Sequence, residues 1–324
     1  MPIPIKMYIN SFCSISPAGV LVPGSLPTSL QQALSPRASC LEPDYKDLIP
    51  AMQLRRMTKP VRTGVAAAKL CLQQEDAALP DAIHVGTAYG MLQDSESFLQ
   101  KMIVQEEQML NPTAFIQSTH NTVAGQIALS MGCNAHNMTY VHKAHSFESA
   151  LLDAALMLED HPGYQVLAGA VDECTDTSYT ILERFGVYHE QNSAGEGATF
   201  FSLSAKAKSN SIARITAFDM FTASGPSEVA ASFTNFLRDN TLTADPGDLL
   251  LDGVAHFDAS AMAFAKNNII SYKQYCGDYP TAVSFALALA TLKLAASEAA
   301  RCWILNGFGR HYSIWCLDKS TITA

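Results

Sequence analysis

The chain has 324 residues, of which 48% are hydrophobic and only 16% are charged, and its formal net charge is −9. A chain of this length and composition can bury a large core, and its sparse charge suggests that a partner subunit covers part of the surface. No cluster of Lys and Arg offers the phosphate contacts that nucleic-acid binding requires. The N-terminus lacks the layout of a signal peptide, so we expect a cytoplasmic protein without a membrane span.

The eight cysteines are scattered along the chain and include no CxxC pair. This spacing argues against structural zinc and is typical of free thiols in a reducing cytoplasm. The longest uncharged apolar run near the C-terminus covers residues 279–292 and is too short to cross a bilayer. It therefore predicts a helix buried in the core.

Short strand-like runs alternate with helical ones, which favours a layered α/β fold. The first segments predict a helix, a strand entering a glycine turn, two helices, and a strand that continues through a polar turn into a helix. They are residues 61–78, 81–90, 95–110, 120–132 and 139–158. The later segments predict strands at 164–174, 195–204 and 213–221, a helix at 227–239, a strand at 248–254, a helix at 282–299 and a strand pair at 301–309 and 311–317.

Two successive parts of the chain repeat this order, which suggests a duplicated architecture. The stretch TASGPS, residues 222–227, is rich in turn-forming residues and is the expected boundary. We therefore predict one compact unit with an N-terminal half over residues 1–222 and a C-terminal half over residues 223–324.

The stretch TYVHKAHSFESALLDAALML, residues 139–158, has the pattern of a nucleophile elbow. A strand that leads directly into a buried helix is a common mount for a catalytic nucleophile, because the helix N-terminus favours an anion. The turn offers His142, Lys143, Ala144, His145 and Ser146, but no cysteine. The sequence thus predicts an elbow without an evident nucleophile.

Several segments, in order and spacing, resemble the β-ketoacyl-acyl carrier protein synthases, which have the thiolase fold. They are HVGTAYG, NTVAGQIALSMG, MTYVHKAHSFESALLDAALML, VLAGAVDEC, GEGATFFSL, SYKQYCGDYPTAVSFALALATL and NGFGRHYSIWCL. The resemblance implies a duplicated five-layered αβαβα arrangement with two mixed sheets. Shorter spacers imply an abbreviated C-terminal half, and the N-terminal half would carry the remnant of the nucleophile elbow.

The same resemblance places departures at the catalytic positions. The family's cysteine position falls on Ala144, whose methyl group cannot be acylated. The first catalytic histidine falls on His256 by one spacing and on Gly253 by another. The family's second catalytic histidine falls on Asp278, while the lysine of the same family loop is retained as Lys273. A carboxylate at that position would repel a developing enolate oxygen.

The last turn departs from the family as well. Arg310 and His311 stand where the family has an aromatic gate and a glycine, so the oxyanion hole formed there is in doubt. We expect Phe147, Phe308, Arg310 and His311 to line a pocket or tunnel. Lys273 is better explained as structural than as catalytic.

These observations lead to a first hypothesis, a non-catalytic subunit of the chain-length-factor type. It would pair with a cysteine-bearing ketosynthase and work with an acyl carrier protein in fatty-acid, polyketide or aryl-polyene biosynthesis. A second hypothesis is an active synthase or acyl transferase that uses Ser146 as nucleophile, with His142 or His145 as base. A third is a homodimeric acyl-binding or regulatory protein.

His142 and His145 are close enough in the sequence to raise the question of a metal. No third ligand accompanies them, so the sequence predicts neither a metal site nor a cofactor there. Polar packing in the turn is the simpler explanation of both side chains. Ser146 is expected to bond backbone groups at the start of the helix.

Overall fold

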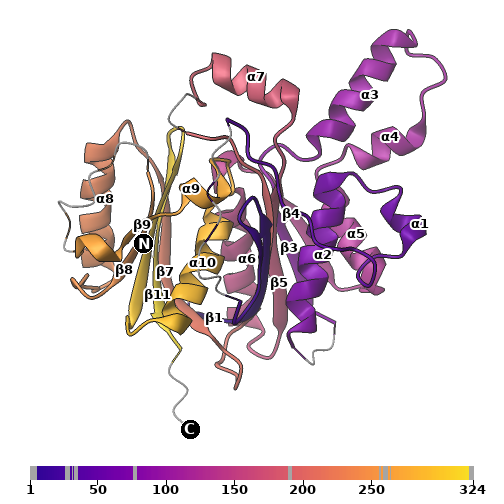
Figure 1. Cartoon of the computed structure of the whole chain (residues 1–324). Helices are drawn as coiled ribbons and strands as arrows, with labels where there is room; N and C mark the ends of the chain where they lie inside the picture. The colour runs from indigo at the N-terminus through magenta and orange to yellow at the C-terminus, as the bar shows by residue number, and fades with distance from the viewer. Residues whose placement is uncertain are drawn as a thin grey trace.

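The computed structural model describes residues 6–25, 30, 32, 36–75, 79–188, 192–254, 257, 262 and 264–320 (Figure 1). The strands are β1 Met7–Ser16, β2 Gly19–Leu21, β3 Ala82–Gly86, β4 His136–Tyr140, β5 Gln165–Asp172, β6 Gly197–Ser204, β7 Ala213–Thr222, β8 Leu249–Gly253, β9 Ile269–Ser271, β10 Arg301–Phe308 and β11 His311–Lys319. The helices are α1 Ala51–Leu54, α2 Lys59–Gln73, α3 Leu92–Val104, α4 Pro112–Gln117, α5 Thr122–Met131, α6 Ser146–Asp160, α7 Asp176–Arg184, α8 Pro226–Asp239, α9 Lys273–Cys276 and α10 Val283–Ala296. Short 3₁₀ helices occupy η1 Lys143–His145 and η3 Lys266–Asn268.

The strands follow the order β4-β3-β5-β6-β1-β7-β11-β10-β8-β9, with β2 beside β1. This order contains the same arrangement twice. Strand β1 of the first half and strand β7 of the second lie at the centre of the whole sheet. Strands β3 and β4 of the first half and strands β8 and β9 of the second lie toward its outer edges. Both half-sheets are mixed, because β3 pairs in parallel with β4 and β5, β8 pairs in parallel with β9 and β10, and the other ladders are antiparallel. The predicted duplication is confirmed.

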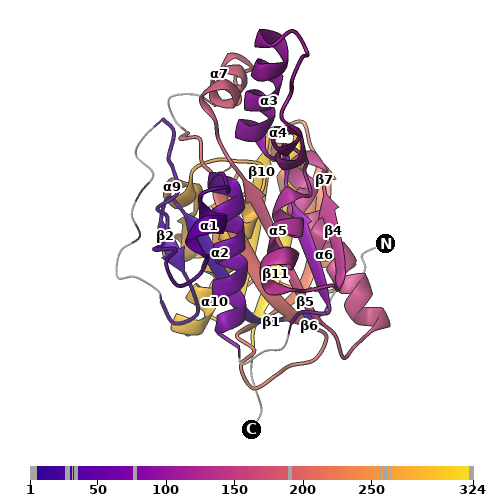
Figure 2. The ribbon, with the colours of Figure 1, turned by 90° about the vertical axis from the view of Figure 1, so that its right-hand side faces the viewer.

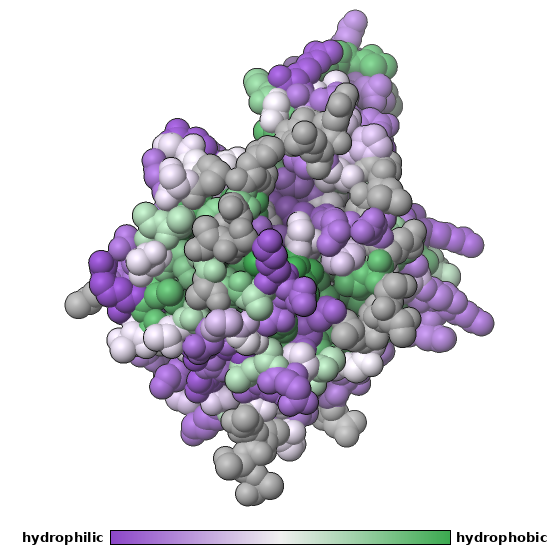
Figure 3. All heavy atoms as spheres, turned by 60° about the vertical axis from the view of Figure 1, so that its left-hand side comes forward, coloured by the Kyte–Doolittle hydropathy of each residue, from purple (hydrophilic) through white to green (hydrophobic). Residues whose placement is uncertain are grey.

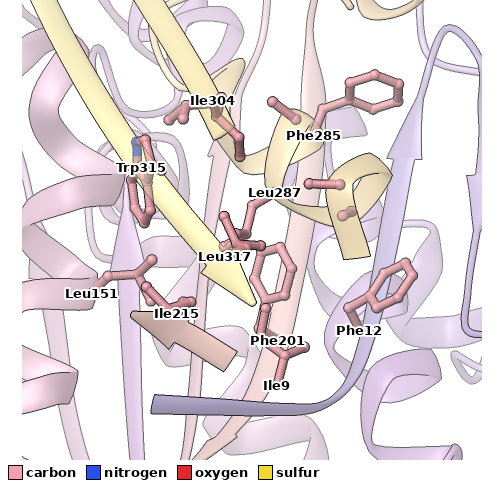
Figure 4. Packing of buried hydrophobic residues seen from close by; sticks show 14 of the residues in the cluster. Ile9, Phe12, Leu151, Phe201, Ile215, Phe285, Leu287, Ile304, Trp315 and Leu317 are labelled. Carbon is pink, nitrogen blue, oxygen red and sulfur yellow. The ribbon is translucent and has the colours of Figure 1, made fainter. Parts of the chain in front are cut away.

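A short antiparallel ladder between β1 and β7 joins the two half-sheets through Met7–Ile9 and Ala213–Ile215. Helices α6 and α10 lie between them, with α2 and α5 outside the first half-sheet and α8 outside the second (Figures 1 and 2). This confirms the five-layered thiolase-like arrangement. The central core contains side chains of both inner helices and both half-sheets, among them Phe201, Phe285 and Trp315 (Figure 4).

Helix α10 is apolar on every side, and its residues from Val283 to Leu292 are all buried. Such a helix is stable only where the protein surrounds it, as the two half-sheets do here. The prediction of a core helix at residues 279–292 is therefore confirmed. Among the described residues, no helix has the length and hydropathy needed to cross a membrane.

Strand β1 is the main element that the sequence analysis did not predict. Its buried polar side chains obscure the strand pattern, but three of them have hydrogen-bond partners. Asn10 donates to the Ser204 hydroxyl at 2.9 Å, Ser11 donates to the Cys71 carbonyl at 2.8 Å, and Ser14 lies 2.8 Å from the Thr199 hydroxyl. Hydrogen bonding of this kind allows a polar strand to occupy the core.

Two further differences concern the helices. Helix α7 was not predicted, and the helix expected over residues 95–110 ends at Val104. After that residue the backbone of Glu106, Glu107 and Met109 has positive φ, which is incompatible with an α-helix.

On the side of α8 the surface shows hydrophilic and hydrophobic residues interspersed (Figure 3).

The predicted division into residues 1–222 and 223–324 stays a prediction, and the topology adds a detail to it. Strand β7 ends at Thr222 but pairs with β11, and it holds the position in the second repeat that β1 holds in the first. We propose that the repeats meet between β6 and β7, in residues 205–212, within one compact unit.

Candidate functional site

The turn between β4 and α6 has the geometry of an elbow. Lys143 adopts a left-handed backbone with φ of 52°, which is uncommon for a residue with a Cβ. The hydroxyl of Ser146 fastens this turn, because it donates to the carbonyl of Lys143 at 2.6 Å and accepts the N–H of His142 at 2.8 Å. Ser146 is fully buried. Its hydroxyl proton is thus already bonded to the backbone.

Strand β3 passes directly beneath the start of α6. A Cβ at Gly86 would lie 2.6 Å from the carbonyl carbon and oxygen of Ser146, a separation that real Cβ atoms do not adopt. Glycine is therefore required where the strand supports the elbow.

Ala144 is buried in a small cluster that we call the Ala144 cluster. Its buried members are Ala144, Tyr188, Ala194 and Phe308, and partly buried Cys174, Tyr179, Leu182 and Val187 pack against them. The elbow, the segment after α7, the turn before β6 and the end of β10 therefore converge on Ala144, the residue that the resemblance assigns to the family's nucleophile position. The structure brings the predicted residues Ala144 and Phe308 together.

Cys174 is the thiol that packs against this cluster, and the sequence analysis did not consider it. Burial raises the pKa of Cys174 to about 11, so the side chain is a neutral thiol at neutral pH. A thiol in that form is a poor nucleophile. Its place after β5 gave no sequence signal, since the residue lies outside the elbow.

His145 lies between the two other histidines of the site. Its ring centre is 5.7 Å from that of His142 and 5.0 Å from that of His311. Its Nε2 lies 3.1 Å from the carbonyl of Tyr312, a contact that requires this nitrogen to carry the proton. Burial, with a smaller contribution from the neighbouring His311 and His142, lowers the pKa of His145 to about 4. His145 is therefore neutral near pH 7.

The other predicted pocket residues are dispersed. Burial and the nearby Lys143 lower the pKa of His311, which faces the elbow. Arg310 is exposed, and its guanidinium donates to the Ser224 hydroxyl at 3.5 Å. Phe147 points away from the Ala144 cluster into the central core, where its ring stacks 6.0 Å from Trp315. The expectation that Phe147 lines the same pocket as Phe308 is corrected by this placement.

Lys273 and Asp278 form an ion pair near the Ala144 cluster. Nζ of Lys273 lies 2.6 Å from Oδ1 of Asp278 and also donates to the carbonyl of Gly307 at the end of β10. Asn192 donates to the other carboxylate oxygen at 3.3 Å. The residue that the resemblance assigns to the family's second histidine position is thus a carboxylate paired with Lys273.

The backbone of Asp278 ties this loop to the turn before β6. Its N–H donates to Ser193, and its carbonyl accepts the N–H of Gly195 at 2.9 Å. A Cβ at Gly195 would lie 2.1 Å from the carbonyl oxygen of Cys276. Gly195 therefore permits this close backbone contact, which places Asp278 beside Ala194.

The first histidine position stays open. Gly253 ends β8, and a Cβ there would lie 2.4 Å from the ring of Tyr272. His256 lies outside the described residues. The neighbouring Asp252 accepts the N–H of Val254 at 3.0 Å, and burial raises the pKa of Asp252 to about 6.

Two buried acids organise the site and were missed from the sequence. Asp172, at the end of β5, accepts bonds from Thr87, Ala88 and Thr281, and burial raises its pKa to about 6. Glu196, within GEGA, forms an ion pair with Lys59 and accepts the N–H of Cys40 at 2.8 Å. An acid immediately after a buried strand or inside a glycine turn is the signal that could have revealed them.

The sheet order, the five layers and the elbow define a chain with the thiolase-like fold. The sequence profile of the β-ketoacyl synthase N-terminal domain matches residues 30–211, more than half of the chain. The chain therefore belongs to the β-ketoacyl synthase family. Among curated proteins, none is significantly similar in sequence.

Solved structures of similar fold cover nearly the whole chain at low identity. A chain of the ishigamide ketosynthase/chain length factor is 14% identical with a TM-score of 0.76, over 98% of this chain and 100% of its own. A chain of the ketosynthase ApeO in complex with its chain length factor ApeC from Xenorhabdus doucetiae is 13% identical with a TM-score of 0.73, over 98% of both chains. A chain of AntDE:AntF, a type II polyketide synthase acyl-carrier protein in complex with its ketosynthase, is 16% identical with a TM-score of 0.74, over 98% of this chain and 100% of its own.

Proposed function

We propose that this chain is a non-catalytic ketosynthase-like subunit of the chain-length-factor type, which pairs with a cysteine-bearing ketosynthase. The observation that carries the proposal is the buried methyl group of Ala144 in the elbow, at the residue that the resemblance assigns to the nucleophile position. A condensing enzyme needs a thiolate there to accept the acyl chain. The Lys273–Asp278 pair supports the same conclusion, because a carboxylate occupies the position of a catalytic histidine.

The alternative nucleophile Ser146 has the wrong surroundings. Its hydroxyl donates to the carbonyl of Lys143, not to an imidazole nitrogen, and its oxygen accepts a backbone N–H. The neutral His145 donates to the Tyr312 carbonyl. Activation of a serine requires a base that accepts its proton. Neither the bond from Ser146 to the Lys143 carbonyl nor the bond from His145 to the Tyr312 carbonyl provides such a base.

The partner surface that we propose is centred on β4, which is an outer strand in the order of the described strands. An edge strand with free backbone groups favours pairing with another chain. Apolar side chains are exposed on β4 and on two helices of the first half, namely Met138 and Val141 at β4, Leu129 on α5, and Phe115 and Ile116 on α4. A ketosynthase of the same fold would present a matching strand, giving an interface related by a pseudo-two-fold axis.

The proposed setting is the cytoplasm, where all eight cysteines, which the structure shows as free, would stay reduced. The proposed pathway builds a fatty-acid, polyketide or aryl-polyene chain on an acyl carrier protein. Among proteins of similar fold are chains of ketosynthase complexes with a chain length factor and with an acyl-carrier protein. A homodimer with the same β4 interface is the competing assembly.

Intact-mass analysis and peptide mapping after incubation with acyl- and malonyl-carrier protein test the proposal. We expect no adduct on the wild-type chain, while a cysteine-bearing ketosynthase treated in parallel is labelled. The matched variant Ala144→Cys tests access, since an adduct on its new thiol would mean that acyl groups reach the elbow and lack only a nucleophile. An adduct on Ser146 or Cys174 of the wild type would overturn the proposal.

A further inference from the structure

Three potential metal ligands meet on the inner face of the first half-sheet, away from the Ala144 cluster. They are His84 of β3, His136 of β4 and Asp153 of α6, and their ligand atoms all lie within 4.8 Å of one another. The sequence analysis considered only His142 and His145 for a metal. It missed this set because the three residues lie far apart in the chain.

The sheet register brings the two histidines together. His84 is paired with Met138 in the parallel ladder of β3 and β4, and His136 lies two residues before Met138. Side chains two residues apart on a strand share a face, so His136 is the diagonal neighbour of His84. The two ring centres are 5.5 Å apart, and α6 covers this face with Asp153 directed at the pair.

His84 lacks the hydrogen bonds that a buried imidazole requires. The residue is completely buried, and neither ring nitrogen makes a hydrogen bond of good geometry with any described residue, although the backbone of Ala150 interacts with the ring. Nδ1 nevertheless lies 3.1 Å from Oδ2 of Asp153. Leaving a buried polar atom without a partner is costly, so an unpartnered nitrogen beside a carboxylate points to a missing ligand.

We propose that His84, His136 and Asp153 form a binding site for a divalent transition-metal ion, with Zn²⁺ as the best-fitting ion. Two imidazole nitrogens and one carboxylate oxygen are a donor set that Zn²⁺ accepts, with a fourth tetrahedral position left open. Donors about 2.0–2.1 Å from a tetrahedral Zn²⁺ lie roughly 3.3 Å from one another. The Nδ1–Oδ2 separation of 3.1 Å already matches this spacing, and the ligand nitrogen of His136 lies within 4.8 Å of both atoms.

The surroundings of the three residues support the site. The hydroxyl of Tyr140 donates to Oδ2 of Asp153 and so orients the carboxylate, as outer-sphere partners of metal ligands do. His136 is exposed and the side chain of Asp153 is 38% exposed, so an ion can reach the buried nitrogen from solvent.

A bound ion would fasten β3, β4 and α6 to one another just before the elbow. Strand β4 leads directly into that turn, so the metal would set the position of the elbow without touching it. This inference does not depend on the proposed function, because it concerns binding by the chain itself.

The test is a titration of the purified full-length chain, freed of any affinity tag, with Zn²⁺ against a chromogenic chelator. We expect one Zn²⁺ per chain, and His136→Ala and Asp153→Asn should each weaken binding at least tenfold. His161→Ala is the matched control, because His161 is an exposed histidine after the far end of α6 and should leave the affinity unchanged. The two ligand variants alter exposed or half-exposed side chains and should fold, which His84 variants need not do.

Two further measurements complete the test. Co²⁺ should give the visible absorption of a tetrahedral site in the wild type but not in Asp153→Asn. The thermal midpoint of the wild type should rise with Zn²⁺ and stay constant in His136→Ala, because a ligand that binds the folded state stabilises it. Absence of stoichiometric Zn²⁺ binding, or equal binding by His136→Ala and the wild type, would overturn the proposal.

Discussion

The ammonium group of Lys273 lies 2.6 Å from the carboxylate of Asp278, and both side chains are largely buried. The lysine also holds the end of β10 through the carbonyl of Gly307, and the backbone of Asp278 holds the turn before β6. The pair therefore joins three segments around the Ala144 cluster. Asp278, which the resemblance assigns to the family's second histidine position, is therefore bonded into the scaffold of the site.

Removing one member of this pair should destabilise the protein. Lys273→Met leaves the carboxylate of Asp278 buried without its cation, and we expect a loss of about 3 kcal/mol in the free energy of unfolding, measured by urea denaturation. The double variant Lys273→Met/Asp278→Asn should recover part of the loss. As a control, Arg238→Met breaks the exposed pair with Asp239 and should cost less than about 1 kcal/mol. Equal losses at the two pairs would contradict a structural role for Lys273.

The sequence predicted the fold more fully than the site. Regular segments such as α10 and the β10–β11 pair carry strong local patterns, so their existence and order follow from hydrophobic periodicity. Strand β1 was missed because Asn10, Ser11 and Ser14 find partners far away in the chain. Long-range pairing of this kind leaves no local signal.

The difference between local patterns and long-range contacts also explains which site residues could be predicted from the sequence. The absence of cysteine at Ala144 and the presence of Asp278 are visible against the family pattern. The bond from Lys273 to Asp278 and the convergence of Tyr188 and Phe308 on Ala144 depend on tertiary contacts. The set of His84, His136 and Asp153 likewise appears only when β3, β4 and α6 are packed.

Ser146 should contribute stability through its two backbone bonds. Ser146→Ala leaves the N–H of His142 and the carbonyl of Lys143 without this partner, and we expect a loss of about 2 kcal/mol in the free energy of unfolding. Ser149→Ala is the control on the same helix, since its hydroxyl contacts only the exposed ring of His142 and should cost below about 0.5 kcal/mol. If the two variants were equally stable by urea denaturation, the capping role of Ser146 would be wrong.

Glu148 should make stability fall as the pH rises. This carboxyl on α6 is fully buried, accepts a bond from Ser313 at 2.7 Å, and has its pKa raised by burial from 4.5 to about 7. The folded state therefore keeps a proton that the unfolded state loses, so the stabilisation is present below pH 4.5 and is lost as the pH rises through about 7. The shift corresponds to about 3 kcal/mol.

The variant Glu148→Gln isolates this effect, because an amide keeps the shape and does not ionise. Between pH 4.5 and pH 8, urea denaturation should show the stability gap between the two proteins changing by about 3 kcal/mol in favour of the variant. The pKa of His145 is lowered to about 4, so this residue makes stability rise with pH between about 4 and its ordinary pKa of 6.5. Both proteins contain His145, so its contribution cancels in the stability gap. A gap that does not change with pH would show that Glu148 is ionised in the folded state.

The proposed partner surface at β4 predicts a selective loss of assembly. Met138 is 43% exposed on this outer strand, and a charge at that position would have to be buried when a ketosynthase covers it. Met138→Glu should weaken association with the cysteine-bearing ketosynthase at least tenfold, measured with co-expressed and purified proteins. Leu41→Glu is the matched control, because Leu41 is 47% exposed and bonds through its backbone to Ser16 at the end of β1, four strands away from β4. Equal weakening by both variants, or retention of the complex by Met138→Glu, would place the interface elsewhere.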